Sequence, residues 1–104
     1  MARFDLYPNP FAPERSHTPM VLDVQNDHLG PLATRVVIPL RTTKAMDKPV
    51  RSLNPLIEVD GRELVLDTAS LAPVPTSLLK RGAPLGRAAR EDVIDALDTL
   101  FGAY

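Results

Sequence analysis

The chain has 104 residues, of which 44% are hydrophobic and 24% are charged, and its formal net charge is −1. This length suits a single domain, residues 1–104, and the composition is that of a folded protein. A net charge so close to zero excludes a global field that would attract nucleic acid or an anionic membrane. The absence of cysteine excludes disulfides, thiolate chemistry and cysteine-based zinc sites.

The sequence carries no signal for export or membrane insertion. Its first ten residues, MARFDLYPNP, lack the apolar run of a signal peptide. Nowhere do about 18 apolar residues follow one another, as a membrane-spanning helix requires. Together with the lack of cysteine, these features predict a soluble cytoplasmic protein without a membrane partner.

Eleven prolines, about twice the usual frequency, decide the expected fold class. They interrupt the chain from Pro8 to Pro84 and then stop. A long helix cannot cross them, because proline removes a backbone donor and clashes with the preceding turn. We therefore expect a chain of short strands that is closed by one C-terminal helix.

The first two predicted strands lie on either side of a proline-rich loop. Residues 3–7 (RFDLY) alternate between polar and apolar side chains, the pattern of a half-buried strand. Residues 8–19 are too rich in proline to be anything but a loop. Residues 20–25 (MVLDVQ) return to extended structure, and residues 26–31 (NDHLGP) predict a turn.

Two further strands are predicted around prolines. Residues 34–40 (TRVVIPL) contain three consecutive β-branched side chains, which favour extended backbone. Pro39 should confine its neighbourhood to a strand end, an edge or a bulge. Residues 69–79 (ASLAPVPTSLL) predict a final extended stretch that Pro73 and Pro75 prevent from being a central strand.

The clearest local signal is a β-hairpin. Asp60-Gly61 lies between two alternating runs, residues 56–59 and residues 62–66. A type I′ turn needs positive φ at both central residues, which aspartate and glycine adopt at low cost.

After a loop over residues 80–87, a helix should begin near Ala88. At 100° per residue, the apolar side chains fall within an arc of about 120°, the width of a core-facing stripe. This stripe comprises Val93, Ile94, Leu97, Leu100 and Phe101. We therefore expect Phe101 in the core. The predicted fold class is α+β, mostly β: a bent antiparallel sheet or partly open small barrel with one C-terminal α-helix.

Tyr104 continues the apolar side of this helix, and two interpretations remain open. It could pack onto its own sheet and contribute about 1.5–3 kcal/mol through burial. Gly102 argues mildly against this, because glycine commonly marks a helix C-terminus. Alternatively, Tyr104 projects as an anchor for another protein, since tyrosine combines a large apolar area with a polar tip.

Signals for catalysis or metal binding are sparse. His17 and His28 are the only histidines, and a zinc site would need a further ligand such as Asp27. Ser16, His17 and Asp23 are the ingredients of a catalytic triad, but the nucleophile elbow is missing. Polar loop residues explain these positions better. We predict no catalytic site, no metal site and no cofactor.

A basic cluster precedes the helix and has two interpretations. It comprises Lys80, Arg81, Arg87 and Arg90. No aromatic residue is interleaved, as a single-strand nucleic-acid binder would need. The cluster is either a solvated loop or a docking patch for an acidic partner.

Five motifs together resemble the CcdB family of toxins. They are LDVQND at 22–27, VVIPL at 36–40, LNPLIEVDG at 53–61, ASLAPVP at 69–75 and LF at 100–101. Their order and spacing are similar to the family pattern across essentially the whole chain. The resemblance implies an SH3-like barrel with a long C-terminal helix and a homodimer.

The resemblance also implies a function. Family members are non-enzymatic toxins of type II toxin–antitoxin pairs, which bind the DNA gyrase A subunit and trap the cleaved-DNA complex without binding nucleic acid directly. A cognate antitoxin wraps the dimer with its disordered C-terminal segment and rescues gyrase.

The same resemblance assigns contact residues. In the family, a tryptophan, a glycine and an aliphatic residue follow the phenylalanine that aligns with Phe101, whereas this chain has Gly102, Ala103 and Tyr104. Either Tyr104 restores the aromatic anchor or gyrase poisoning is weakened, since losing a buried indole costs about 2–4 kcal/mol. The implied gyrase-binding set is Asn26, His28, Leu29, Asp98, Phe101, Gly102, Ala103 and Tyr104. The implied antitoxin-binding set, suited to an acidic disordered peptide, is Lys80, Arg81, Arg87 and Tyr104.

Two other functions stay open on the same fold. One is a ribonuclease toxin, in which Arg35 with Asp23 or His28 would face one RNA phosphate. The other is a non-toxic homologue that survives as an antitoxin binder.

Overall fold

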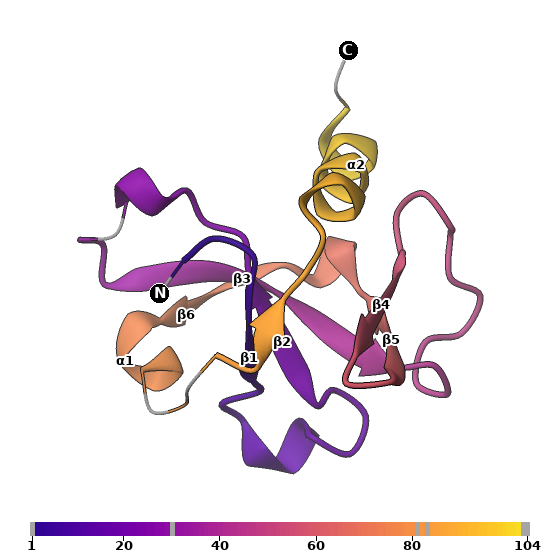
Figure 1. Ribbon diagram of the computed structural model, residues 1–104, viewed down its shortest axis with the longest axis horizontal. Coiled ribbons are helices and arrows are strands. Elements are labelled where there is room, and N and C mark those ends of the chain that lie inside the picture. Colours follow the sequence, from indigo (N-terminus) through magenta and orange to yellow (C-terminus); the bar gives the residue numbers. More distant parts are fainter. Residues whose placement is uncertain (1, 30, 81, 83, 103–104) are drawn as a thin grey trace.

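In the described part of the chain, seven strands form one antiparallel sheet that curls into a nearly closed barrel, with one long helix at its C-terminal end (Figure 1). The computed structural model describes residues 2–29, 31–80, 82 and 84–102. The strands are β1 (Asp5–Pro8), β2 (Met20–Asp23), β3 (Thr34–Thr42), β4 (Leu56–Val59), β5 (Arg62–Leu66), β6 (Ala72–Pro75) and β7 (Gly86–Arg87). The helices are α1 (Thr76–Leu79) and α2 (Arg90–Phe101), and the 3₁₀ turns are η1 (Ala12–Glu14), η2 (Asp27–Leu29) and η3 (Thr68–Ser70).

The strand order is β4-β5-β3-β2-β1-β7, and β6 pairs with β3 beside β5. This arrangement confirms the predicted class, α+β and mostly β with a small barrel. In the part of the chain described here, no helix combines the length and the apolar character that crossing a bilayer requires.

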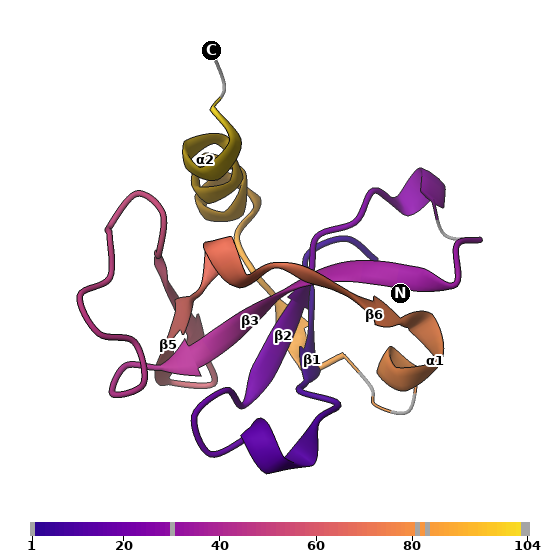
Figure 2. The same cartoon turned by 180° about the vertical axis from the view of Figure 1, so that it is seen from behind.

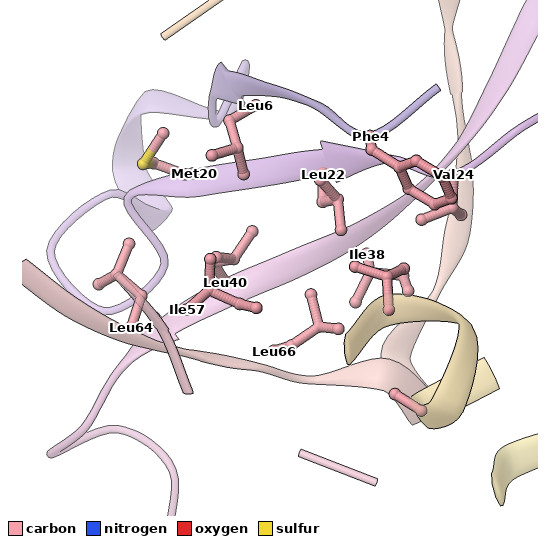
Figure 3. Close-up of a cluster of buried hydrophobic side chains, with 12 residues drawn as sticks. Phe4, Leu6, Met20, Leu22, Val24, Ile38, Leu40, Ile57, Leu64 and Leu66 are labelled. Atoms are coloured by element: carbon pink, nitrogen blue, oxygen red, sulfur yellow. The ribbon is translucent and has the colours of Figure 1, made fainter. Parts of the chain in front are cut away.

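Side chains from one face of the sheet make the main hydrophobic core. Figure 3 shows them converging from β1, β2, β3 and β5, with α2 beside Ile38. Val93 and Ala96 of α2 complete this core, and both are fully buried. A second cluster on the other face contains Tyr7, Val21, Val37, Val74 and Leu79. Strand β2 is therefore buried on both faces, because Met20 and Leu22 belong to the main core and Val21 belongs to the second cluster.

The predicted hairpin is confirmed with the expected bounds. Strands β4 and β5 are joined by Asp60, at φ 52°, and Gly61, at φ 79°. Both angles lie in the left-handed region that a type I′ turn requires.

Replacing Gly61 should therefore reveal backbone strain alone. A Cβ added at Gly61 meets no atom within 4 Å, so no steric clash interferes. We expect Gly61→Ala to lower the free energy of unfolding by about 1 kcal/mol, because the Cβ of alanine makes a positive φ sterically unfavourable. Gly61→Asn is the matched control, since asparagine tolerates this region better. Chemical denaturation measures both variants. An alanine variant as stable as the asparagine variant would contradict the turn geometry.

The prediction for Pro39 was wrong, because this residue lies inside the nine-residue strand β3. Its carbonyl accepts a hydrogen bond from the Asp67 N–H at 3.0 Å, so its backbone groups face β5 and β6. Strand β6 pairs with β3 up to Val37, and β5 pairs with it from Leu40 onward. Pro39 thus occupies the point where the partner strand changes. Its missing N–H leaves out the return hydrogen bond to the Asp67 carbonyl, which accepts from the Ser70 N–H at 3.0 Å instead.

The region after Leu71 was predicted only in part. Strand β6 pairs with β3 alone, as its two prolines indicated. The rest of the predicted extended stretch is wrong, because residues 76–79 form α1, which places Leu79 over the second cluster. The predicted loop over residues 80–87 also contains β7, which pairs with β1 through Asp5↔Arg87 and Leu6↔Gly86.

Helix α2 begins at Arg90, two residues later than predicted, and its apolar stripe is only partly buried. Ile94 and Leu97 pack against the core, whereas Phe101 is 71% exposed. The placement of Phe101 in the core was therefore wrong. The physical reason is visible in Figures 1 and 2, where α2 rises away from the sheet and its last turn extends beyond the barrel.

Candidate functional site

The loop between β2 and β3 presents polar and apolar side chains to solvent. Asn26, Asp27, His28 and Leu29 are all exposed, and Leu29 is 47% exposed. Hydrogen bonds within the loop shape it: the Asn26 side-chain oxygen accepts from the His28 N–H at 3.0 Å, and the Asn26 carbonyl accepts from the Leu29 N–H at 3.0 Å. The loop thus has a defined 3₁₀ shape, η2, rather than an open turn.

The side chain of Gln25 holds this loop against the barrel through hydrogen bonds. Its amide oxygen accepts a hydrogen bond from the Val36 N–H at 3.0 Å. Its amide nitrogen donates to the Thr34 carbonyl at 3.1 Å and to the Leu29 carbonyl at 3.4 Å. A single buried side chain therefore replaces ladder hydrogen bonds where β2 leaves β3, and it connects both ends of the loop.

We expect Gln25→Ala to lower the free energy of unfolding by about 1–3 kcal/mol, because it leaves partly buried backbone groups without a partner. The amides of η2 should also exchange faster with solvent in hydrogen-exchange measurements. Thr99→Ala serves as control, since the Thr99 hydroxyl donates only to an exposed helix carbonyl. That variant should stay within about 0.5 kcal/mol of the parent protein. Equal effects of the two substitutions would show that Gln25 does not hold the loop.

Beneath the loop lies a buried ion pair between β2 and β3. Arg35 Nε donates to Asp23 Oδ2 at 2.9 Å, and Arg35 Nη2 donates to Asp23 Oδ1 at 3.0 Å. Side-chain exposure is 2% for Arg35 and 0% for Asp23. Arg35 Nη2 also donates to the Gln25 carbonyl at 3.2 Å and lies 3.5 Å from Asp27 Oδ1. The pair thus supports the residues on which the loop is built.

Burial affects the pKa of Asp23 more strongly than its ion pair with Arg35 does. Removal from water raises the pKa of Asp23 above its ordinary value, although the Arg35 guanidinium and the Gln25 N–H act in the opposite direction. A charge pair with these properties fixes geometry more than it adds stability. Asp23 and Arg35 do meet, as the ribonuclease hypothesis required, but they satisfy each other out of reach of solvent.

The second predicted contact region is the end of α2. Asp98 is exposed, and its carbonyl accepts a hydrogen bond from the Gly102 N–H at 2.8 Å. Gly102 ends the helix with φ 78°, a conformation that glycine adopts without strain. Phe101 stands exposed just before it. Ala103 and Tyr104 lie outside the described residues, so the two interpretations of Tyr104 stay as they were.

The two regions share one side of the molecule without touching each other. In Figures 1 and 2, the turn η2 and the end of α2 both lie on the upper side of the sheet and are clearly separated in both views. Within one protomer, the structure therefore does not bring η2 and the end of α2 together. A partner that contacts both must span the space between them.

The basic residues are spread over two elements. Lys80 is exposed at the end of α1. Arg87 in β7 lies 3.4 Å from Asp5 Oδ1 and donates to the Arg3 carbonyl at 2.7 Å, and its side chain is 63% exposed. Arg90 is exposed at the first turn of α2, and Arg81 lies outside the described residues. Among the described members of this set, which are Lys80, Arg87 and Arg90, only Arg87 has part of its charge engaged by a carboxylate of the same chain.

The two histidines lie at opposite ends of β3. The His17 carbonyl accepts a hydrogen bond from the Thr42 N–H, whereas His28 belongs to the turn that Gln25 ties to Thr34. In the described part of the chain, no group of three metal-ligating side chains comes together.

Sequence reasoning missed the two groups that support the loop. Gln25 was assigned to a strand, and Asp23 and Arg35 were considered only as a nominal catalytic set. One signal was available: Asp23 and Arg35 are opposite charges in two adjacent strands made mostly of apolar residues, where an unpaired charge would be costly.

The comparisons with known proteins agree with this architecture. No curated protein matches the sequence at a significant level. A family profile described as CcdB protein matches residues 3–102. Because this match covers nearly the whole chain, the protein belongs to the CcdB family, a family of toxins from toxin–antitoxin systems.

Proposed function

We propose that this protein is the toxin of a type II toxin–antitoxin pair and acts by binding the DNA gyrase A subunit. It holds the gyrase–DNA cleavage complex through non-covalent contacts and makes or breaks no bond itself. The contact surface consists of the end of α2 and the loop η2. The proposed gyrase-binding residues are Asn26, His28, Leu29, Asp98, Phe101, Gly102, Ala103 and Tyr104.

The observation that carries this proposal is the exposure of Phe101. A phenylalanine that is 71% exposed, at the end of a helix rising from the barrel, offers a large apolar surface that the described part of its own chain does not cover. Aromatic side chains in such positions are typical anchors of protein interfaces. Leu29, on the same side of the molecule, adds a second exposed apolar contact.

The toxin would act as a homodimer in the cytoplasm. Two copies would present two α2 ends and two η2 loops, related by the symmetry of the dimer. A cognate antitoxin would neutralise it through an acidic disordered segment. Lys80, Arg81 and Arg87 are the proposed cationic contacts, with Tyr104 shared between the two partners.

The buried ion pair argues against a ribonuclease. Arg35 and Asp23 have side-chain exposures of 2% and 0%, so an RNA phosphate cannot reach them without unfolding the strands around them. His28 is exposed, but nothing places it in contact with this pair. Incubating purified protein with labelled RNA tests this exclusion, and we expect intact RNA.

Expression in bacteria tests the main proposal. We expect growth arrest, relieved both by co-expressed antitoxin and by a substitution in the gyrase A subunit at the contact surface. A chain that cells tolerate and that purified gyrase ignores would end the proposal.

One sequence feature favours a second candidate, a non-toxic homologue that binds antitoxins. The chain contains no tryptophan, whereas the family places one directly after the phenylalanine that aligns with Phe101. Gly102 occupies that position with φ 78°, which strains any residue with a side chain. Calorimetry separates the candidates: the homologue would bind antitoxin tightly and the gyrase A subunit not at all.

A further inference from the structure

The sheet ends at β4, and the second edge of this strand pairs with no strand among the described residues. Two observations fix which backbone groups face that edge. The Leu66 N–H donates to the Pro55 carbonyl at 3.1 Å, and the two-residue turn closes Val59 against Arg62. Hydrogen-bonded pairs alternate along an antiparallel ladder. The backbone groups of Leu56 and Glu58 must therefore point outward.

Strand β6 shows how the same fold blocks an edge. The Thr76 N–H donates to the Ala33 carbonyl at 2.8 Å, so Val74 and Ala72 face β3 in the ladder. The outward positions of β6 are then Pro73 and Pro75, which have no N–H to offer. On β4 the outward positions are a leucine and a glutamate, each with a backbone donor and acceptor that no described residue engages. The β6 edge is therefore closed to pairing, whereas the β4 edge is open.

The side chains along the open edge are apolar and acidic. Leu56 is 54% exposed, and a cavity of about 490 Å³ lies beside it, lined also by Arg51 and Asp92. Glu58 is exposed and stands directly opposite Glu63 in a pair without mutual hydrogen bonds, the arrangement that brings side chains closest. Like charges in this position destabilise a sheet. Among the described residues, no cation lies within ion-pair distance of either carboxylate.

We propose that the outer edge of β4 binds an extended, lysine- or arginine-bearing segment of another polypeptide, which adds a strand to the sheet. Backbone donors and acceptors at strand spacing are matched by another extended backbone. A cationic side chain opposite Glu58 would relieve its repulsion with Glu63.

A second copy of this chain fits the edge poorly. Two β4 edges paired with each other would bring Glu58 and Glu63 of both copies, four carboxylates, onto one short ribbon. The edge is also separate from the proposed gyrase surface: β4 and η2 lie on opposite flanks of the molecule in Figure 1, and the α2 residue beside the edge, Asp92, belongs to the first turn of the helix and not to its end. Peptide binding at this edge can therefore be tested independently of toxin activity.

Nuclear magnetic resonance titration of the full chain tests this proposal. The probe is a short blocked peptide of alternating lysine and valine, compared with a glutamate-for-lysine twin and with a backbone N-methylated twin. We expect the lysine peptide to shift the amide signals of Leu56 and Glu58 and to slow their hydrogen exchange, while both twins leave them unchanged.

Two variants locate the charge effect. Glu58→Lys should weaken binding of the lysine peptide about fivefold or more, because it replaces a favourable cross-strand pair by a repulsive one. Glu91→Lys makes the same change of net charge on the exposed side of α2 and should leave the affinity unchanged.

Three results would overturn the proposal. The first is no shift at Leu56 or Glu58 at millimolar peptide, and the second is equal binding by the N-methylated twin. The third is protection of these two amides with rising protein concentration in the absence of peptide, which would show that the edge pairs with a second copy.

Discussion

Substituting Phe101 by alanine is expected to weaken binding to the gyrase A subunit by roughly 30- to 1,000-fold, because an aromatic anchor at the centre of an interface typically carries about 2–4 kcal/mol. The substitution should have little effect on the stability of the fold. Phe101 is 71% exposed, so its removal deprives the core of almost nothing, and the free energy of unfolding should fall by less than about 1 kcal/mol. Calorimetric titration with the A subunit and chemical denaturation measure the two quantities separately.

Leu85→Ala provides the control for the Phe101 variant. Leu85 is also a large exposed apolar residue, at 48%, but it precedes β7 and lies outside the proposed contact set. Its loss should leave gyrase affinity unchanged. If Phe101→Ala binds as tightly as the parent protein, the end of α2 is not the anchor. If it unfolds instead, Phe101 must be buried in a way that the structure does not show.

Removing Arg35 should have the largest effect on stability. Arg35→Met keeps most of the side-chain volume and leaves Asp23 as an uncompensated buried charge. We expect the free energy of unfolding to fall by about 3–5 kcal/mol, a large part of the 5–15 kcal/mol typical of a domain. Arg87→Met is the matched control, because Arg87 pairs with Asp5 at the surface, where an ion pair contributes about 0–1 kcal/mol.

Replacing Asp23 together with Arg35 shows whether the ion pair stabilises the fold or only fixes the geometry of the two strands. Because burial raises the pKa of Asp23 despite its arginine partner, the pair gains little over apolar side chains. The double variant Asp23→Leu with Arg35→Met should therefore recover most of the stability that Arg35→Met loses. A double variant as unstable as the single one would show that the pair itself, rather than the orphaned charge, contributes the stability.

Features that depend on a few neighbouring residues were predictable from the sequence. Asp60-Gly61 determined both strands of the hairpin with their bounds, because a type I′ turn requires only local backbone angles. The prolines correctly placed β6 at an edge. The short helix α1 and the two-residue strand β7 were missed, because both depend on contacts with a distant part of the chain. Leu79 of α1 packs in the same cluster as Tyr7, and β7 is a strand only through its pairing with β1.

The candidate site shows the same limit. The helical wheel correctly grouped the apolar side chains of α2, but periodicity cannot tell where the core ends along a helix. Ala96 was missed and Phe101 was misplaced for this reason, because α2 docks through its first turns and then leaves the barrel. Asp23 and Arg35 meet only through the pairing register of β2 and β3, which the sequence does not reveal.

If the protein acts by binding gyrase with the end of its helix, removing that end must weaken the complex. A binding titration of the purified gyrase A subunit compares the full chain with a chain that stops at Phe101. We expect the full chain to bind and the shortened chain to bind at least about tenfold more weakly, a loss of about 1.4 kcal/mol. Equal affinity of the two chains, or no binding by the full chain, would show that the protein does not act through the end of α2.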